Sequence, residues 1–264
     1  MAESFIFCQV TEVLVEERRQ RVLDLVSTRG FVALNDLAQA VQASESTIRR
    51  DIDFLARKGS LRATRGGAMF LGNGNLPAFE DRTSTQLEEK RAIAQVAASR
   101  IRDGDCVLLD GGTTTLEVAR LLVGRPVQIV TNSLPIASLF ANRREADLVL
   151  LGGYVYPRTG VALGPATIRM MEDIQAHQAV LSVGGLTDKG LFNSNLLLVE
   201  TERQMMRCAD EVVVVADHTK IGRPALAFLC ELPAIDTLIV DAGLTRDQRR
   251  LLNQTDVRVI LAGE

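Results

Sequence analysis

The chain has 264 residues, 47% of them hydrophobic and 24% charged, with a net charge of −3. This composition excludes a disordered or fibrous chain, and the length exceeds that of a usual single domain, so we expect two domains. No apolar run reaches the roughly 18–20 residues that span a bilayer. The start, MAESFIFCQVTEVLVEERR, lacks a basic leader with a small-residue cleavage site. We therefore expect a cytoplasmic protein without membrane contact.

The cysteines and histidines give little material for a metal site. The four cysteines are widely scattered, none at a metal-ligand spacing such as CxxC from another, and there are only two histidines. Buried thiols in a reducing cytosol are the expected state. We expect no metal and no cofactor.

Charge is distributed unevenly along the chain. Between Glu45 and Gly67 there are six basic and three acidic residues, a local charge of +3, which leaves about −6 for the remainder. A basic patch within an acidic protein is typical of a specific DNA-binding module joined to another domain.

Three short helices are predicted in the N-terminal part. The first covers residues 16–29, with Gly30 placed to end it. Asn35 is the expected N-cap of a second helix, DLAQAV. After a short turn, Ser44 is the expected N-cap of a third helix that runs to Gly59. Two helices joined by so short a turn form a helix-turn-helix.

The third helix has an apolar and a basic face. Ile48, Ile52 and Leu55 fall within one narrow arc and must face the core. The opposite face is polar and rich in arginine, which suits the major groove of DNA. SLRATRGGAMF, residues 60–70, then predicts a two-stranded wing. The expected DNA contacts are Ser44, Ser46, Thr47, Arg49, Arg50, Asp53, Arg57, Arg62 and Arg65.

A linker and an α/β domain follow. LGNGNLP, residues 71–77, has the composition of a flexible boundary. Ser84 or Thr85 is the expected cap of a helix containing KRAIAQVAASRI. Seven unbroken apolar runs alternate with helical segments, which indicates a mainly parallel sheet covered on both faces. These runs are CVLLD, VQIVT, DLVLLG, QAVLSVG, EVVVVAD, TLIVD and VRVIL.

The strand ends carry polar residues and glycines. GGTTT, residues 111–115, follows the first run and opens a helix, so its hydroxyls and free amides suit an anion, most plausibly a phosphate. A capped turn is the alternative reading of that loop alone. Four further strand ends carry polar residues or glycines, and ligands of such sheets bind at this edge.

Both halves resemble one bacterial repressor family. EERRQRVLDLV, NDLAQAVQASESTIRRDIDFLARKGSL and RATRGGA resemble the DNA-binding domain of the DeoR family over residues 16–68. DGGTTT, VTNS, LLGG, GGLTDKGL, Glu200 and ADHTK resemble its effector domain from about Glu88 to Asp241. Family members usually begin just before the ERR stretch, so we expect Met1 to Val13 to be a disordered arm or an upstream start choice.

The resemblance implies a winged helix-turn-helix joined to a fold related to ribose-5-phosphate isomerase and the coenzyme A transferases. It implies an effector resembling a sugar phosphate at the strand ends, with its phosphate on Gly112, Thr113 and Thr114. Arg158 is a further candidate for an anionic group, from its loop position. The expected effector contacts are Asp110, Gly112, Thr113, Thr114, Asn132, Ser133, Gly153, Arg158, Asp188, Glu200 and Lys220.

The domain prediction is an extension (1–15), a winged helix-turn-helix (16–70), a linker (71–79) and an effector-binding and oligomerisation domain (80–264). The predicted function is a repressor that binds double-stranded operator DNA as a dimer or tetramer and is released by a phosphorylated sugar or sugar acid. The alternative is an isomerase-like enzyme with an accessory DNA-binding domain, since Asp188, Lys189 and Glu200 are suited to proton transfer.

Overall fold

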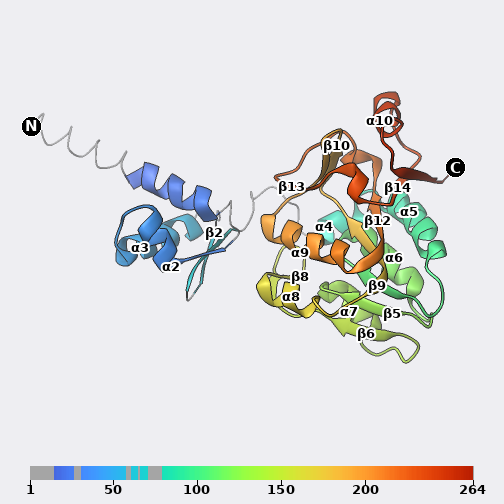
Figure 1. Cartoon of the computed structure of the whole chain (residues 1–264), viewed down its shortest axis with the longest axis horizontal. Helices are drawn as coiled ribbons and strands as arrows, with labels where there is room; N and C mark the ends of the chain where they lie inside the picture. Colours follow the sequence, from blue (N-terminus) through green and yellow to red (C-terminus); the bar gives the residue numbers. More distant parts are fainter. Residues whose placement is uncertain (1–14, 27–30, 58–60, 65, 71–78, 264) are drawn as a thin grey trace, which may run out of the picture. The chain divides into compact units, whose positions relative to one another are not determined.

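The structure is a computed structural model that describes residues 15–26, 31–57, 61–64, 66–70 and 79–263 (Figure 1). The chain divides into two compact units, Met1–Leu76 and Pro77–Glu264. In the part of the chain that the structure describes, no helix is both long and apolar enough to cross a membrane.

The described part of the first unit is a winged helix-turn-helix. Its first helix covers residues 15–26. The elements that follow are β1 (Phe31–Ala33), α2 (Leu34–Ala40), α3 (Glu45–Arg57), β2 (Leu61–Thr64) and β3 (Gly67–Phe70). The antiparallel strand order is β1-β3-β2, so β2 and β3 form the predicted wing. Strand β1, which the sequence did not predict, completes the sheet.

The helix caps of this unit agree only in part with prediction. The cap at Ser44 is confirmed, because its Oγ accepts a hydrogen bond of 3.3 Å from the amide of Thr47. The prediction of Asn35 as a cap is wrong: α2 follows β1 directly and its N-cap is Ala33, so Asn35 lies in the first turn. The predicted end at Gly30 and the last turn to Gly59 lie outside the described residues.

The second unit is built on a seven-stranded sheet whose neighbouring strands are all parallel. Its order is β15-β14-β12-β9-β4-β5-β6. Each of the seven predicted apolar runs is one of its strands. They are β4 (Cys106–Leu109), β5 (Gln128–Thr131), β6 (Asp147–Leu150), β9 (Ala176–Ser182), β12 (Ala209–Ala216), β14 (Thr237–Asp241) and β15 (Arg258–Ala262).

Helices cover both faces of this sheet, which explains why its strands are apolar without interruption (Figure 1). On β4, Val107 and Leu109 belong to the core of one face and Leu108 to the core of the other. The first face is covered by α5 (Leu87–Arg100), α6 (Thr113–Leu122) and α7 (Leu134–Phe140). The second is covered by α8 (Pro165–Met170), α9 (Leu196–Arg207) and α10 (Arg246–Leu252).

Several short elements lie outside the main sheet and were not predicted. Strands β7 (Tyr154–Tyr156) and β8 (Val161–Leu163) form a hairpin, and β10 (Gly185–Thr187), β11 (Gly190–Asn193) and β13 (Ala227–Cys230) form an antiparallel sheet. Two 3-10 turns are η1 (His218–Lys220) and η2 (Leu232–Ala234). Helix α4 (Phe79–Ser84) begins at the last residue expected for the linker.

The predicted cap of α5 is wrong. Ser84 belongs to α4, and α5 begins at Leu87 after Gln86, whose left-handed backbone (φ 52°) separates the two helices. Thr85 lies between them. The sequence suggested one helix because FEDRTS shows no apolar period of its own. Helix α4 is instead held by contacts with the rest of the unit, described below.

Candidate functional site

Helix α3 presents a polar face to solvent. Ser46, Arg49, Arg50, Asp53 and Arg57 are exposed, as predicted, whereas the apolar arc faces the core of the first unit. At the N-terminal end of this face, the Ser44 hydroxyl lies 2.9 Å from the hydroxyls of both Ser46 and Thr47. A short helix face with hydroxyls at its start and arginines along it suits phosphates and base edges.

The arginines of this face differ in how far they are engaged. Arg49 lies 3.8 Å from Glu45 in an exposed ion pair, and Nε of Arg57 donates to the Asp53 carbonyl at 3.3 Å. Arg50 has no hydrogen bond or ion pair with any described residue, so its guanidinium is available to a partner. On the wing Arg62 is exposed, and Arg65 lies outside the described residues.

Asp51 lies on the opposite side of α3 and is 1% exposed. Its Oδ2 accepts from Nε of Arg18 at 2.7 Å, and its Oδ1 accepts from Nε of Arg19 at 2.9 Å. The guanidinium of Arg19 also stacks on the Phe54 ring, 3.7 Å from its centroid. Asp51 therefore joins α3 to the first helix, a contact the sequence analysis did not predict.

In the second unit, the loop between β4 and α6 follows the predicted phosphate-loop pattern. Gly112 is the N-cap of α6, so the amides of the first turn have no acceptor within the helix. A Cβ on Gly112 would lie 2.0 Å from Oγ of Ser182, which requires glycine at this approach to β9. Thr113 and Thr114 are buried, and their hydroxyls make no hydrogen bond with the described residues.

Asp110 and Thr115 hold this loop in place. Asp110 is buried and its carboxylate accepts hydrogen bonds from the Gly112 amide (3.2 Å), the Ser182 amide (2.9 Å) and the Ser182 hydroxyl (3.1 Å). Oγ1 of Thr115 donates to the Asp110 carbonyl at 2.9 Å. Asp110 therefore supports the loop between two strands, since both of its oxygens are already engaged.

The end of β5 lies beside this loop. The side-chain amide of Asn132 donates to the Ala162 carbonyl at 3.0 Å, which joins β5 to β8. Ser133 is the N-cap of α7. A Cβ on Gly111 would lie 3.5 Å from Cβ of Ser133, so the two loops are in direct contact. Gly153 packs against Thr167 of α8, which accounts for a glycine there without a ligand.

Buried polar atoms without a partner gather at this edge of the sheet. In the described residues such side-chain atoms are Nε and Nη2 of Arg82, Nε of Arg100, Oδ1 of Asn132, Oγ1 of Thr159, Nδ2 of Asn195 and Oε2 of Glu202. Asn132 follows β5, Thr159 lies between β7 and β8, and Asn195 caps α9. Arg82 of α4 and Glu202 of α9 are close enough to Asp110, at the end of β4, to interact with it electrostatically. A buried polar group without a partner costs about 1–3 kcal/mol, so these atoms are candidates for contact with a bound ligand or ordered water.

Two buried carboxyls of this region share a raised proton affinity. Burial raises the pKa of Asp110 to about 6, despite its hydrogen bonds from Ser182, Thr115 and Gly112. Burial raises the pKa of Glu202 well above its ordinary range, and the nearby charge of Asp110 raises it further. Glu202 is 2% exposed and accepts one hydrogen bond, of 2.6 Å, from the side chain of Asn193.

Asp110→Asn tests this raised proton affinity. A carboxyl whose pKa is higher in the folded than in the unfolded protein contributes its full stabilisation at a pH below the unfolded-state pKa. This stabilisation is lost as the pH rises through the folded-state pKa. Glu202 is present in both proteins, so the test is the difference between them: between about pH 4 and above pH 6 we expect the wild-type second unit to lose about 3 kcal/mol more unfolding free energy than the variant. Calorimetry of the full chain across this range measures it.

Asp188→Asn is the matched control, because Asp188 is an exposed carboxyl in the turn between β10 and β11. Its pH profile should follow that of the wild type. A wild-type stability that rises from pH 4 to 6 relative to Asp110→Asn would contradict the assignment.

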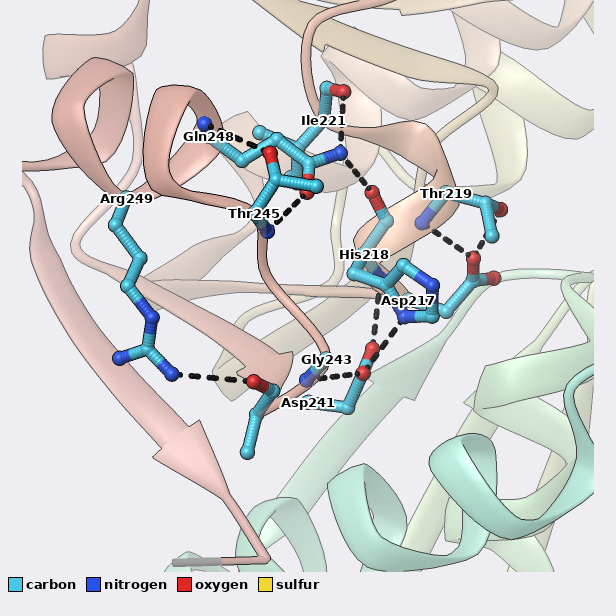
Figure 2. A network of polar contacts seen from close by, with 10 residues as sticks. Asp217, His218, Thr219, Ile221, Asp241, Gly243, Thr245, Gln248 and Arg249 are labelled. Atoms are coloured by element: carbon cyan, nitrogen blue, oxygen red, sulfur yellow. Dashed lines mark hydrogen bonds and ion pairs between the residues drawn. The ribbon is translucent and has the colours of Figure 1, made fainter.

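A hydrogen-bond network fixes the loop after β12, as Figure 2 shows. Asp241 lies at the end of β14. Its Oδ1 accepts a hydrogen bond from the His218 amide at 2.6 Å, and its Oδ2 lies 2.7 Å from Nδ1 of the His218 ring. The side chain of Gln248 donates to the carbonyls of His218 (2.8 Å) and Ile221 (3.1 Å). Asp217 caps η1 by accepting from the Thr219 amide. This network positions Lys220 at the end of η1.

The remaining predicted effector contacts differ in position. Arg158 and Lys220 are partly buried, whereas Asp188 and Glu200 are exposed, the latter on α9. The buried carboxylate of α9 is Glu202, which shares a helix face with Val199 and Met205. This spacing of three is the signal in the sequence that distinguishes Glu202 from Glu200.

The comparisons with known proteins agree with both units. Residues 18–73 match the DeoR-like helix-turn-helix domain, and residues 85–242 match the DeoR C terminal sensor domain. The chain belongs to the DeoR family. As a DeoR-family protein it is a DNA-binding transcriptional regulator with a helix-turn-helix domain and a separate sensor domain.

Curated relatives of this DeoR-family chain match along nearly its whole length. It is 30% identical to the HTH-type transcriptional repressor CsqR of Escherichia coli K12 over 257 residues, covering 97% of this chain and 98% of the relative. It is 30% identical to the glycerol-3-phosphate regulon repressor of the same strain over 228 residues, covering 86% and 90%.

Solved structures resemble it more distantly. Ribose 5-phosphate isomerase A from Methanocaldococcus jannaschii is 18% identical with a TM-score of 0.39, covering 52% of this chain and 55% of that one. The eIF2B delta subunit from Chaetomium thermophilum is 14% identical with a TM-score of 0.41, covering 85% and 70%.

Proposed function

We propose that this DeoR-family chain represses a sugar or sugar-acid catabolic operon and is released from its operator by a phosphorylated sugar or sugar acid. The observation that carries the proposal is the cluster of unpaired buried polar atoms at the strand ends, next to the free first turn of α6. Helix N-termini favour anions, and a polyhydroxylated phosphate offers both the charge and the hydroxyls that such a cluster needs.

The proposed effector contacts come from the loops at the ends of β4 and β5. They are Gly112, Thr113, Thr114, Asn132 and Ser133. Lys220 adds a positive charge from the fixed loop after β12. Asp110 is a supporting residue rather than a ligand contact, because its oxygens are engaged by Gly112 and Ser182. Glu202 replaces the exposed Glu200 as the carboxyl of this site.

The proposed mechanism couples two sites through an oligomer. A homodimer or tetramer would place two winged helices on paired half-sites, and the effector would favour an arrangement that no longer fits them. Exposed apolar side chains on β6, β7 and α8 support self-association: Val149, Leu150, Val155 and Met170 are each more than a third exposed.

Operator binding tests the proposed function. Fragments selected from genomic DNA by the full chain are titrated at fixed ionic strength, with and without phosphorylated sugars and sugar acids. We expect one compound to weaken operator binding roughly 5- to 150-fold, a coupling of about 1–3 kcal/mol, and the operator to weaken binding of that compound by the same factor. The unphosphorylated sugars are the matched control, and a panel without effect would contradict the proposal.

Enzymatic turnover is the alternative, and the buried pair of Asp110 and Glu202 is the observation that favours it. A carboxyl with a raised pKa can hold a proton for transfer near neutral pH. Against it, the relatives matched along their length are transcriptional regulators. Incubation of the full chain with the same panel should leave each compound unchanged, and steady conversion would favour the enzyme.

A further inference from the structure

Helix α4 is the first described element after residues 71–78, which follow the wing. It packs against α6, whose N-terminus carries the phosphate-loop pattern. The buried ammonium of Lys90 donates to the carbonyls of Arg82 (2.5 Å) and Thr85 (2.6 Å), so the C-terminal end of α4 is held by a cation. α4 is therefore fixed at one end and lies beside the proposed effector site.

Arg82 points an unpaired edge into this region. Its Nε and Nη2 atoms are both buried and have no hydrogen-bond partner in the described residues. These two atoms form one edge of the guanidinium and direct two parallel N–H groups the same way. That geometry matches two oxygens of one phosphate or carboxylate group.

The neighbouring protein groups do not supply those oxygens. Asp110 is close enough to act on Arg82 electrostatically, but its carboxylate is engaged by Gly112 and Ser182. Tyr156 is the other group that acts on Arg82, and the side chain of Asn195 lies beside Tyr156. The two unpaired donors of Arg82 therefore have no acceptor among the described residues and can take one from outside the chain.

We propose that Arg82 binds the anionic group of the effector through its Nε–Nη2 edge, so that the effector acts directly on α4, the helix leading into the sensor domain. This inference rests on the proposed function, which it deepens by naming the residue that senses the charge.

The test uses the full chain with inorganic phosphate as the probe, at constant ionic strength. Arg82→Gln is expected to weaken phosphate binding about tenfold or more, and Arg82→Lys to recover part of it, since lysine keeps the charge without the paired donors. Arg144→Gln is the matched control, because Arg144 is an exposed arginine of the same unit. Calorimetric titration gives the affinities.

Two further measurements separate binding from a structural role. Without phosphate, Arg82→Gln should melt at or above the wild-type midpoint, because the change removes buried unpaired donors. With phosphate, amide exchange in peptides covering residues 79–90 should slow in the wild type and in Arg144→Gln but not in Arg82→Gln. A lower midpoint with phosphate affinity intact would overturn the proposal, as would a wild type that does not bind phosphate.

The outcomes also distinguish this inference from the proposed function. If phosphorylated compounds release the operator while Arg82→Gln keeps its phosphate affinity, the assignment of Arg82 fails and the regulatory function stands. If phosphate binding depends on Arg82 but no phosphorylated compound alters operator affinity, the regulatory function fails and the assignment of Arg82 as an anion-binding residue stands.

Discussion

Replacing Arg50 with alanine is expected to weaken operator binding about 30-fold or more, because an arginine contact to a base edge is worth about 1–3 kcal/mol and two copies would read paired half-sites. Arg50 is exposed on α3 and is not engaged by any described residue, so the change would remove the proposed DNA contact without breaking an internal one. Titration of a selected operator fragment at several salt concentrations measures the loss and its salt dependence.

The salt series identifies the kind of contact that Arg50 makes. Loss of a phosphate contact lowers the salt slope by about one per copy, whereas loss of a base contact reduces discrimination between operator and unrelated DNA. Arg144→Ala has the same change in charge on the other unit and should bind as the wild type does. Unchanged operator affinity in Arg50→Ala at every salt concentration would show that α3 is not the helix that contacts the bases of the operator.

The helix-turn-helix could be predicted because its signals are local. Ile48, Ile52 and Leu55 repeat at helical spacing, and their burial fixes which face of α3 is exposed. Asp51 lies in the same stripe, three residues after Ile48, but its partners lie 32 and 33 residues earlier in the chain. A single sequence carries no signal for a pairing between residues so far apart. It shows only that a charged residue, Asp51, interrupts the apolar face of α3.

The sensor domain shows the same division between local and distant signals. Its strands are predictable because burial on both faces leaves them apolar along their length, and the GGTTT loop is read from adjacent residues. The cluster of unpaired buried polar atoms is not local, since Arg82 comes from α4, Asn132 from the end of β5, and Glu202 from α9. The family resemblance points to Glu200, whereas helix periodicity favours Glu202, which lies three residues from both Val199 and Met205.

Replacing Asp51 with alanine is expected to destabilise the first unit by about 2–4 kcal/mol. Removing one partner of a buried ion pair costs about 3–5 kcal/mol. We expect somewhat less here because Arg18 and Arg19 are each about a quarter exposed to solvent. For a unit of this size that loss lowers the melting midpoint by roughly 10–25 °C. Calorimetry of the full chain resolves it as a shift in the transition of the first unit alone.

Asp53→Ala is the matched control for this prediction, because it removes the same side chain two residues further along the same helix. Asp53 is exposed and its side chain holds no ion pair with a described residue, so its loss should change stability by no more than about 0.5 kcal/mol. Equal stabilities of the two variants would show that the contact between α3 and the first helix contributes nothing measurable. A large difference would show that α3 depends on its contact with Arg18 and Arg19 for its position.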